Sequence, residues 1–328
     1  MEEQDLVDVL IATYNPQKEF FQKQIESILN QTHKNIHIYI SDDCSKNESI
    51  KQFLKEYEKK DKRITLIFQE KNLGCTKNFG YLLEKSTANY ICYSDQDDIW
   101  YENKIEKCLK KIKEEKVDLI YCNCKQINED EKIIHNNYFK YKNVPLIKGK
   151  DKLARSRCIG IGCSQMFTKN LKEKIIPFKE SVIAHDWIVS YMANEMNGMS
   201  YIEEPIFDYR LHTGNIFGGR SLEQNLSIWK NKNGISYDSY LKYRKEKVIN
   251  KAYLYGARMC LDYTKNKEEQ SYIEKLINYY ESLNKSKYIN LHFIKYFKFL
   301  SGRNLLKKMI KEFVIFHFPI IGYIKFKF

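Results

Sequence analysis

Carboxylate side chains gather in one short stretch of the sequence, SDQDDIW at residues 94–100. Asp95 and Asp97 are two residues apart, so they point the same way if the backbone stays extended. Clustered carboxylates repel one another unless a cation neutralises them. Their oxygens suit a hard divalent ion that also holds a diphosphate. The stretch therefore predicts a metal-assisted site for a phosphorylated ligand, and the alternative is a set of solvated turn and cap residues.

A second candidate group, His185-Asp186-Trp187, follows some 90 residues later. Asp186 stands apart from the 94–100 stretch and opens a helix-like segment, so it is a candidate general base for a reaction next to the metal-held diphosphate. His185 and Trp187 would order its side chain or form a wall for a bound substrate. The alternative is an N-cap aspartate beside a core tryptophan.

Regular elements must bring these residues together. The first half of the chain alternates short apolar runs with segments of helical period. We expect strands at 6–13, 36–40, 63–68, 90–94 and 118–124, and helices at 20–29, 50–57, 76–85 and 102–115. This order predicts a parallel sheet with helices on both faces. Ligands of such sheets bind at the carboxyl ends of the strands.

Polar residues stand at these strand ends. Thr13 and Tyr14 follow the first strand, Asp42 and Asp43 follow the second, and the 94–100 stretch follows the fourth. Five carboxylates are thus predicted at one edge of the sheet. For Asp42 and Asp43 taken alone, a turn role is the stronger interpretation.

Beyond residue 128 the pattern loosens. We expect a strand at 159–167, a helix at 187–196, a strand at 206–210 and a glycine-containing loop at 214–219. Residues 221–283 are polar and mostly helical in pattern. No GxxxxGK[ST], no GxGxxG after a strand and no HExxH is present, which argues against a P-loop NTPase, a dinucleotide dehydrogenase and a zincin.

The basic charge lies at the C-terminal end. Residues 285–328 contain ten Lys or Arg and one Glu, which is most of the net charge of +13. Nucleic-acid binding is disfavoured because the predicted cleft is acidic and repels phosphates. Aromatic residues alternate with lysines in this tail, so it is predicted to lie on an anionic membrane, or else to pack on the core or on a second subunit in a homodimer.

The N-terminus, MEEQDLVDVL, has no basic segment followed by an apolar one, and the longest apolar run has 12 residues. Neither a secretory signal nor a membrane span is expected. The predicted location is cytoplasmic, with the tail allowing peripheral attachment to the inner face of the cell membrane.

Several segments together resemble a known family. VDVLIATYNP, IYISDDCS, NLGCTKNFGYLLEKSTANYICYSDQDDIW, AHDWIVSYMA and YRLHTGN are similar, in that order, to motifs of the family 2 inverting glycosyltransferases with the glycosyltransferase-A fold. SDQDDIW, HDW and YRxH together look most like the bacterial rhamnosyltransferase-like branch. The resemblance covers about residues 5–220. It departs from the branch at 213–215, which read Thr-Gly-Asn in place of Gly-Asn-Asn.

The resemblance implies an α/β fold, with a mostly parallel Rossmann-like sheet flanked by helices and a mainly helical C-terminal extension. The catalytic domain would span 1–220, with a nucleotide-sugar half at about 1–125 and an acceptor half at 126–220. Residues 221–328 would form the helical region with the basic aromatic tail.

The resemblance also implies which residues bind the nucleotide sugar. Thr13 and Tyr14 would flank the base. Asp42 or Asp43 would accept hydrogen bonds from the base or ribose, and which of the two does so is left open. Asp95 would meet the ribose or the metal-bound phosphate.

A second set of roles concerns the metal and the reaction. Asp97 would ligate Mg²⁺ or Mn²⁺, with Asp98 supporting it. His212 would be a second metal or phosphate contact, although a strand histidine with no ligand role is an equal alternative from the residue alone. Arg210 would face the diphosphate, and Asp186 would be the catalytic base.

The resulting expectation is a metal-dependent inverting glycosyltransferase that builds a bacterial surface glycan such as a capsule, O-antigen or cell-wall polysaccharide. Its acceptor would be a glycan or a lipid-linked glycan. The first choice of donor is dTDP-L-rhamnose, and UDP-glucose or UDP-galactose is the alternative. From different classes, a non-catalytic glycan-assembly scaffold and a nucleic-acid-binding protein remain as alternatives.

Overall fold

The computed structural model describes residues 5–155, 158–212, 214–215 and 250–285. The chain divides into two compact units, residues 1–212 and 213–328, and each is described by itself. In the helices that the structure describes, no segment combines the length and the apolar character needed to cross a membrane.

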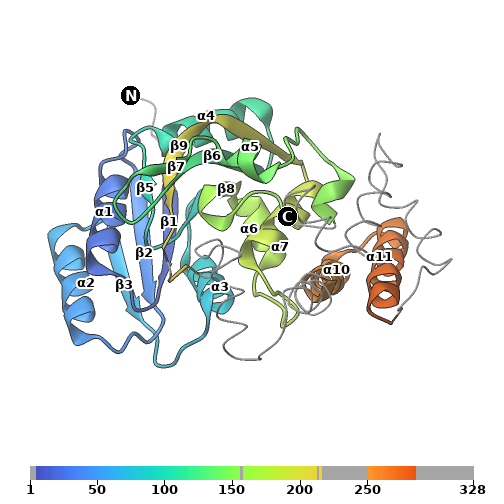
Figure 1. Ribbon diagram of the computed structural model, residues 1–328, viewed down its shortest axis with the longest axis horizontal. Coiled ribbons are helices and arrows are strands. Elements are labelled where there is room, and N and C mark those ends of the chain that lie inside the picture. The colour runs from blue at the N-terminus through green and yellow to red at the C-terminus, as the bar shows by residue number, and fades with distance from the viewer. Residues whose placement is uncertain (1–4, 156–157, 213, 216–249, 286–328) are drawn as a thin grey trace. The chain divides into compact units, whose positions relative to one another are not determined.

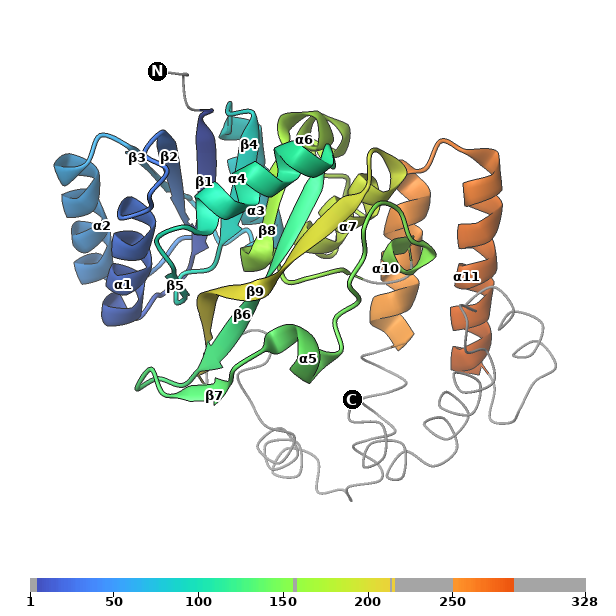
Figure 2. The ribbon, with the colours of Figure 1, turned by 90° about the horizontal axis from the view of Figure 1, so that it is seen from above.

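The N-terminal unit begins with a parallel half-sheet in the order β3-β2-β1-β4 (β1–β3 are labelled in Figure 1, all four in Figure 2). The strands are β1 (Val7–Thr13), β2 (Ile36–Asp42), β3 (Ile64–Phe68) and β4 (Tyr90–Ser94). Thr13 lies opposite Asp42, and Asp42 lies opposite Phe68, so these strands end at one edge. The predicted strands of this half are confirmed.

The other half of the sheet is mixed. It contains β5 (Ile99–Trp100), β6 (Leu119–Ile127), β7 (Ile133–His135), β8 (Gln165–Thr168) and β9 (Met199–Arg210). β8 lies antiparallel between β4 and β6, β9 runs parallel to β6, and β5 and β7 add antiparallel pairs. The expectation of a mostly parallel sheet is therefore confirmed for the first half and for the β6–β9 pair, whereas β5, β7 and β8 pair antiparallel.

The strand expected at 159–167 was wrong over most of its length. Residues 162–164 form a 3₁₀ turn, η2 (Gly162–Ser164), and β8 starts only at Gln165. Gly160 has a φ of +78°, a backbone conformation that residues other than glycine rarely adopt. This conformation interrupts an extended strand. Ile159 and Cys163 are buried before and within this turn, whereas Met166 and Phe167 are buried in β8.

Helices cover both faces of the sheet. The predicted helices correspond to α1 (Lys18–Leu29), α2 (Glu48–Lys60), α3 (Cys75–Lys85), α4 (Lys104–Glu115) and α7 (His185–Glu195). Figure 1 shows α1 and α2 on one face of the parallel half and α3 on the other. Two short helices, α5 (Tyr138–Lys142) and α6 (Lys169–Ile175), and the 3₁₀ turn η1 (Lys152–Arg155) were not predicted, and Figure 2 shows α5 beside β7.

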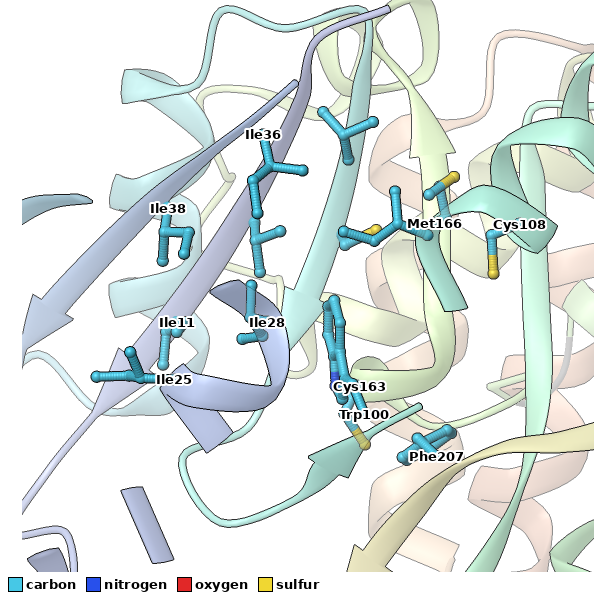
Figure 3. Packing of buried hydrophobic residues seen from close by; sticks show 14 of the residues in the cluster. Ile11, Ile25, Ile28, Ile36, Ile38, Trp100, Cys108, Cys163, Met166 and Phe207 are labelled. Atoms are coloured by element: carbon cyan, nitrogen blue, oxygen red, sulfur yellow. The ribbon is translucent and has the colours of Figure 1, made fainter. Parts of the chain in front are cut away.

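Apolar side chains at period two in the strands and at helical spacing in the helices form one core. Ile25 and Ile28 of α1 meet Ile36 and Ile38 of β2 in this cluster (Figure 3). Each of these side chains is at most 3% exposed, and full burial of such a side chain contributes about 1.5–3 kcal/mol. The core thus fixes the strand ends that carry the polar residues.

The outer edge of the parallel half is β3. Its Leu66 N–H donates to the Glu58 carboxylate of α2 at 2.8 Å. The Lys55 ammonium lies 5.5 Å from the ring centre of Phe68 in the same strand. Side chains of α2 therefore cover part of this edge.

The described part of the second unit is a helical pair, α10 (Asn250–Tyr263) and α11 (Lys267–Lys285), whose backbones pack together. The Asn266 side chain accepts the Glu268 N–H at 2.8 Å at the start of α11. Arg258 and Glu281 form an ion pair at 2.9 Å between the helices. The helical expectation is confirmed for 250–283, whereas 221–249 and the tail beyond 285 lie outside the described residues.

Candidate active site

The loop after β1 is tied to the acidic residues after β4. Gln96 accepts two bonds with its side-chain oxygen, from the Thr13 hydroxyl at 2.7 Å and from the Tyr14 N–H at 2.9 Å. Residues 95–98 are called the acidic loop below. The Tyr14 side chain is 45% exposed and free to meet a flat ligand, while Thr13 is buried. The structure thus brings both predicted base-flanking residues beside the acidic loop.

Asp42 and Asp43 are both buried and both bond to protein groups. The Asp42 carboxylate accepts the N–H of Ser45 at 3.0 Å and its hydroxyl at 2.5 Å. The Asp43 carboxylate accepts the N–H groups of Leu73 at 2.6 Å and Gly74 at 2.8 Å, directly before α3. Each carboxylate has further acceptor positions. A contact with the nucleotide base or ribose stays a prediction for both.

The acidic loop holds two carboxylates whose charges are costly. Burial, and then the charge of Asp97, raises the pKa of Asp95 to about 7. Burial, followed by the charges of Asp97 and Asp95, raises the pKa of Asp98 well above its usual value. One Asp98 oxygen accepts the Arg210 N–H at 3.2 Å, and the other has no hydrogen-bond partner among the described residues.

A cation would remove this cost. Ligand atoms of Asp95, Asp98 and Cys163 all lie within 4.8 Å of one another. The two carboxylates and the unpartnered oxygen of Asp98 fit a hard ion such as Mg²⁺ or Mn²⁺. Burial raises the pKa of Cys163 well above its usual value, so this soft group stays a thiol. Its Sγ lies within 4.8 Å of carboxylate oxygens of Asp95 and Asp98, and a soft thiol is a poorer ligand for a hard ion than the two carboxylates are.

Asp97 and His212 meet at the other side of the acidic loop. The His212 Nε2 lies 2.7 Å from an Asp97 carboxylate oxygen, and both side chains are at most 11% exposed. The His212 ring also lies 5.5 Å from the ring of Phe20. The structure brings these two predicted ligands together, while the three-residue group that gathers for an ion contains Asp95 and Asp98. Ligation by Asp97 and His212 stays a prediction.

Arg210 is fully buried beneath the acidic loop. Its Nε donates to the Asp97 carbonyl oxygen at 2.9 Å, and one terminal nitrogen donates to the Glu129 carbonyl oxygen at 3.2 Å. The other terminal nitrogen pairs with Glu131 at 3.2 Å. The guanidinium lies 4.4 Å from the ring centre of Phe20. In this arrangement Arg210 holds the backbone of the acidic loop. Its contact with the diphosphate stays a prediction.

Asp186 is the second residue of α7, where the positive end of the helix favours a carboxylate. Its charge is close enough to raise the pKa of Asp95 and of Cys158. The side chain is partly exposed. The structure therefore places the predicted base near the acidic loop and within reach of solvent.

The neighbours of Asp186 face inward. The His185 ring stacks on Phe79 at 4.1 Å and meets the edge of Tyr93 at 4.8 Å. Burial lowers the pKa of His185, so its imidazole is neutral. Trp187 is only 6% exposed and packs in the interior. Of the two predicted wall residues, neither offers a broad free ring face, and their role toward an acceptor stays a prediction.

Three residues of this region carried no assigned role from sequence. Gln96 joins the two loops, Cys163 lies beside the carboxylates, and Cys75 opens α3. The Cys75 residue is exposed, and partial desolvation and then the charges of Asp95, Asp186 and Asp43 raise its pKa to about 12. Cys75 therefore lies amid the predicted site. Gln96 and Cys75 stand inside the quoted motifs, whereas nothing in the sequence around Cys163 marks it.

The family profile described as Glycosyl transferase family 2 matches residues 8–176, just over half of the chain. The chain belongs to this family, and the protein is a glycosyltransferase.

Two relatives are informative. The putative teichuronic acid biosynthesis glycosyltransferase TuaG of Bacillus subtilis is 33% identical over 105 residues, which are 32% of this chain and 41% of that protein. The dTDP-rhamnosyl transferase RfbG of Shigella flexneri is 25% identical over 292 residues, which are 80% of this chain and 95% of that protein. The chain thus spans less than half of TuaG and nearly all of RfbG.

Two solved structures share the fold. S. aureus TarS 1-349 in complex with UDP-GlcNAc has a TM-score of 0.57 at 14% identity, with 97% of this chain and 87% of that chain covered. The mannosyltransferase PcManGT of Pyrobaculum calidifontis, in complex with GDP-Man and Mn²⁺, has a TM-score of 0.55 at 12% identity, with coverages of 97% and 82%. At these identities the likeness establishes the glycosyltransferase-A-type fold and nothing more.

Proposed function

We propose that this protein transfers a sugar from a nucleotide-sugar donor to a glycan with inversion of the anomeric configuration and with the help of a divalent cation. The observation that carries the proposal is the pair of carboxylates after β4, the half-buried Asp95 and the fully buried Asp98, with Asp186 close by. These residues match in type the two needs of the reaction, a charged centre for the diphosphate and a base for the acceptor.

The proposed ion is Mg²⁺ or Mn²⁺, held by carboxylates of the acidic loop. It would supply positive charge to the departing diphosphate. The unpartnered Asp98 oxygen and the raised pKa of Asp95 support a cation there. That a fold relative contains Mn²⁺ agrees with this choice.

Asp186 is proposed to take the proton of the acceptor hydroxyl. No second carboxylate is proposed as a nucleophile, so the reaction would be a single displacement, in which the configuration inverts. Asp186 sits at a helix start on a rigid element, which favours a well-oriented base. Tyr14, with its exposed ring, is proposed to meet the nucleotide base, and Asp42 or Asp43 the base or ribose.

The proposed donor is dTDP-L-rhamnose, since a relative that covers 80% of the chain is named a dTDP-rhamnosyl transferase. UDP-hexoses such as UDP-glucose and UDP-galactose are the alternative. The complex of a fold relative with UDP-GlcNAc supports this alternative. The name of TuaG supports a bacterial surface glycan as the acceptor class.

Further proposals concern the location. A lipid-linked acceptor would be reached most easily by a cytoplasmic enzyme attached to the membrane through residues 285–328, by two-dimensional diffusion. That tail, and a homodimer formed through it, lie outside the described residues except for Lys285. Nucleic acid is not a proposed partner, because the acidic loop repels phosphates when no cation is bound.

The test is release of nucleoside diphosphate from a panel of dTDP- and UDP-sugars, with Mn²⁺, with Mg²⁺ and with a chelator. We expect release from one donor, dependent on the metal and on Asp186. An enzyme that turns over equally well with the chelator contradicts the metal role. A chain that binds a sugar nucleotide but never releases the diphosphate with any glycan acceptor is a scaffold instead.

A further inference from the structure

Lys104 is a buried cation next to the acidic loop. It is the first residue of α4 and is only 3% exposed. A lysine is disfavoured at a helix N-terminus, because the positive end of the helix repels it, and burial of a charge adds a further cost. No ion pair of Lys104 with a carboxylate occurs among the residues that the structure describes. Its position therefore calls for another compensation.

The compensation comes from a carbonyl group and two aromatic rings. The ammonium of Lys104 donates to the Cys163 carbonyl oxygen at 2.7 Å. It lies 3.4 Å from the ring centre of Trp100 and 4.4 Å from that of Phe207. Figure 3 shows Trp100, Cys163 and Phe207 at one end of the core cluster. Lys104 thus joins β5, β9 and the turn η2, and desolvated contacts of a cation with rings are strong.

The turn that Lys104 holds touches both halves of the site. On one side, the Cys163 Sγ lies within 4.8 Å of carboxylate oxygens of Asp95 and Asp98. On the other, a methyl group added at Gly162 would lie 2.7 Å from the His185 Nε2 and 3.6 Å from the Asp186 Cβ. The residue next to Cys163 is therefore in close contact with the start of α7. The turn η2 separates the carboxylates of the acidic loop from the predicted base.

We propose that Lys104 is a positioning residue, whose ammonium fixes the turn η2 and thereby sets the distance between the cation-binding carboxylates and Asp186. This rests on the proposed function, because it assigns Lys104 to the same site. Lys104 itself does not touch the donor or the acceptor. A misplacement of about 1 Å between reacting groups costs on the order of 100-fold in rate, so a buried anchor at this place matters.

The test compares Lys104→Met, Gly162→Ala and the double variant in the full chain. Methionine retains the length and the apolar stem of lysine but leaves the Cys163 carbonyl without its donor. The matched control is Lys110→Met on the same helix, where the side chain is 73% exposed. The measurements are kcat and KM for the donor, the thermal midpoint of unfolding, and Mn²⁺ binding without donor by electron paramagnetic resonance.

For Lys104→Met, kcat is expected to fall about 10- to 100-fold with donor KM within about 3-fold of wild type. The Mn²⁺ dissociation constant should rise at least about 5-fold, because the turn that carries Cys163 beside both carboxylates is no longer held. Since both changes act through one turn, the double variant should fall by much less than the product of the single losses. Lys110→Met should match wild type.

Two results would overturn the role of Lys104 and leave the proposed function standing. The first is a Lys104→Met variant that behaves as Lys110→Met does. The second is a double variant whose loss of kcat equals the product of the two single losses. If Lys104→Met does not fold, Gly162→Ala and Cys163→Ala replace it in the same cycle, and multiplicative losses again refute the relay. A wild-type chain that neither binds Mn²⁺ nor releases nucleotide overturns the proposed function instead.

Discussion

Arg210 offers a sharp test of whether the acidic loop is held from inside the protein. Arg210→Met removes the guanidinium but retains an unbranched apolar side chain that can still contact Phe20. The Asp97 carbonyl oxygen then loses a charged donor at 2.9 Å, and the Glu129 carbonyl oxygen loses one at 3.2 Å. We therefore expect a less stable protein with a displaced acidic loop.

The size of the effect follows from the two bonds. A hydrogen bond to a charged group contributes about 1.5–3 kcal/mol where both partners are buried. The Glu129 side of the loop is closer to solvent, and the Glu131 partner is 38% exposed, so water replaces part of these contacts. The expected loss is about 2–4 kcal/mol of unfolding free energy. At about 2–4 °C per kcal/mol, the thermal midpoint falls by about 4–16 °C.

The assay is thermal unfolding of wild type, Arg210→Met and the control Arg63→Met, together with donor KM. The Arg63 side chain is 31% exposed and pairs with Asp61 at 2.8 Å, so its loss should cost less than about 1 kcal/mol. If Arg210→Met unfolds at the wild-type temperature while donor KM rises steeply, the guanidinium serves the diphosphate and the internal role is refuted.

Four further predictions concern the reaction and the tail. Asp186→Asn should slow transfer by on the order of 10²–10⁴ with donor binding intact, and a rate within a few-fold of wild type places the base elsewhere. Asp97→Ala should fold but lose Mn²⁺-dependent donor binding, measured by calorimetry; unchanged affinity with the same Mn²⁺ dependence excludes it as a ligand. From β-linked dTDP-L-rhamnose, NMR should show an α-rhamnoside, and a retained configuration rejects single displacement. The full chain should co-sediment with anionic but not neutral vesicles, less so at high salt, whereas indifference to anionic vesicles assigns residues 285–328 to the core or a dimer interface.

The parallel half of the sheet could be predicted because each element repeats its apolar residues with the period of a strand or a helix. The alternation of Ile36, Ile38 and Ile40 in β2 is an example, and all three are buried. In the mixed half, the strands expected at 118–124 and 206–210 correspond to β6 and to the end of β9, whereas the segment at 159–167 could not be assigned, because it is equally compatible with a buried turn and a strand. The period of the apolar residues shows which side chains are buried. It does not show which strand pairs with which, or in which direction, because contacts between residues distant in sequence decide this.

Some residues of the candidate site could likewise be predicted from the sequence, and others could not. Residues that directly follow strands were predictable, because parallel strands align their ends; the acidic loop and the pairing of Thr13 with Asp42 illustrate this. The internal bonds of Arg210 and the burial of Lys104 were not. A lysine at a helix start has the pattern of a solvent-facing residue, and only the three-dimensional structure shows the carbonyl group and rings that hold it.

The bond between Glu58 and the Leu66 N–H bears on self-association of the protein. An edge strand with free N–H and C=O groups is a template for pairing with another chain, and proteins commonly protect such edges. Here the carboxylate occupies an N–H group that an incoming strand would need, and Lys55 adds a charge beside Phe68. The β3 edge of the described sheet is therefore protected against growth by strand addition.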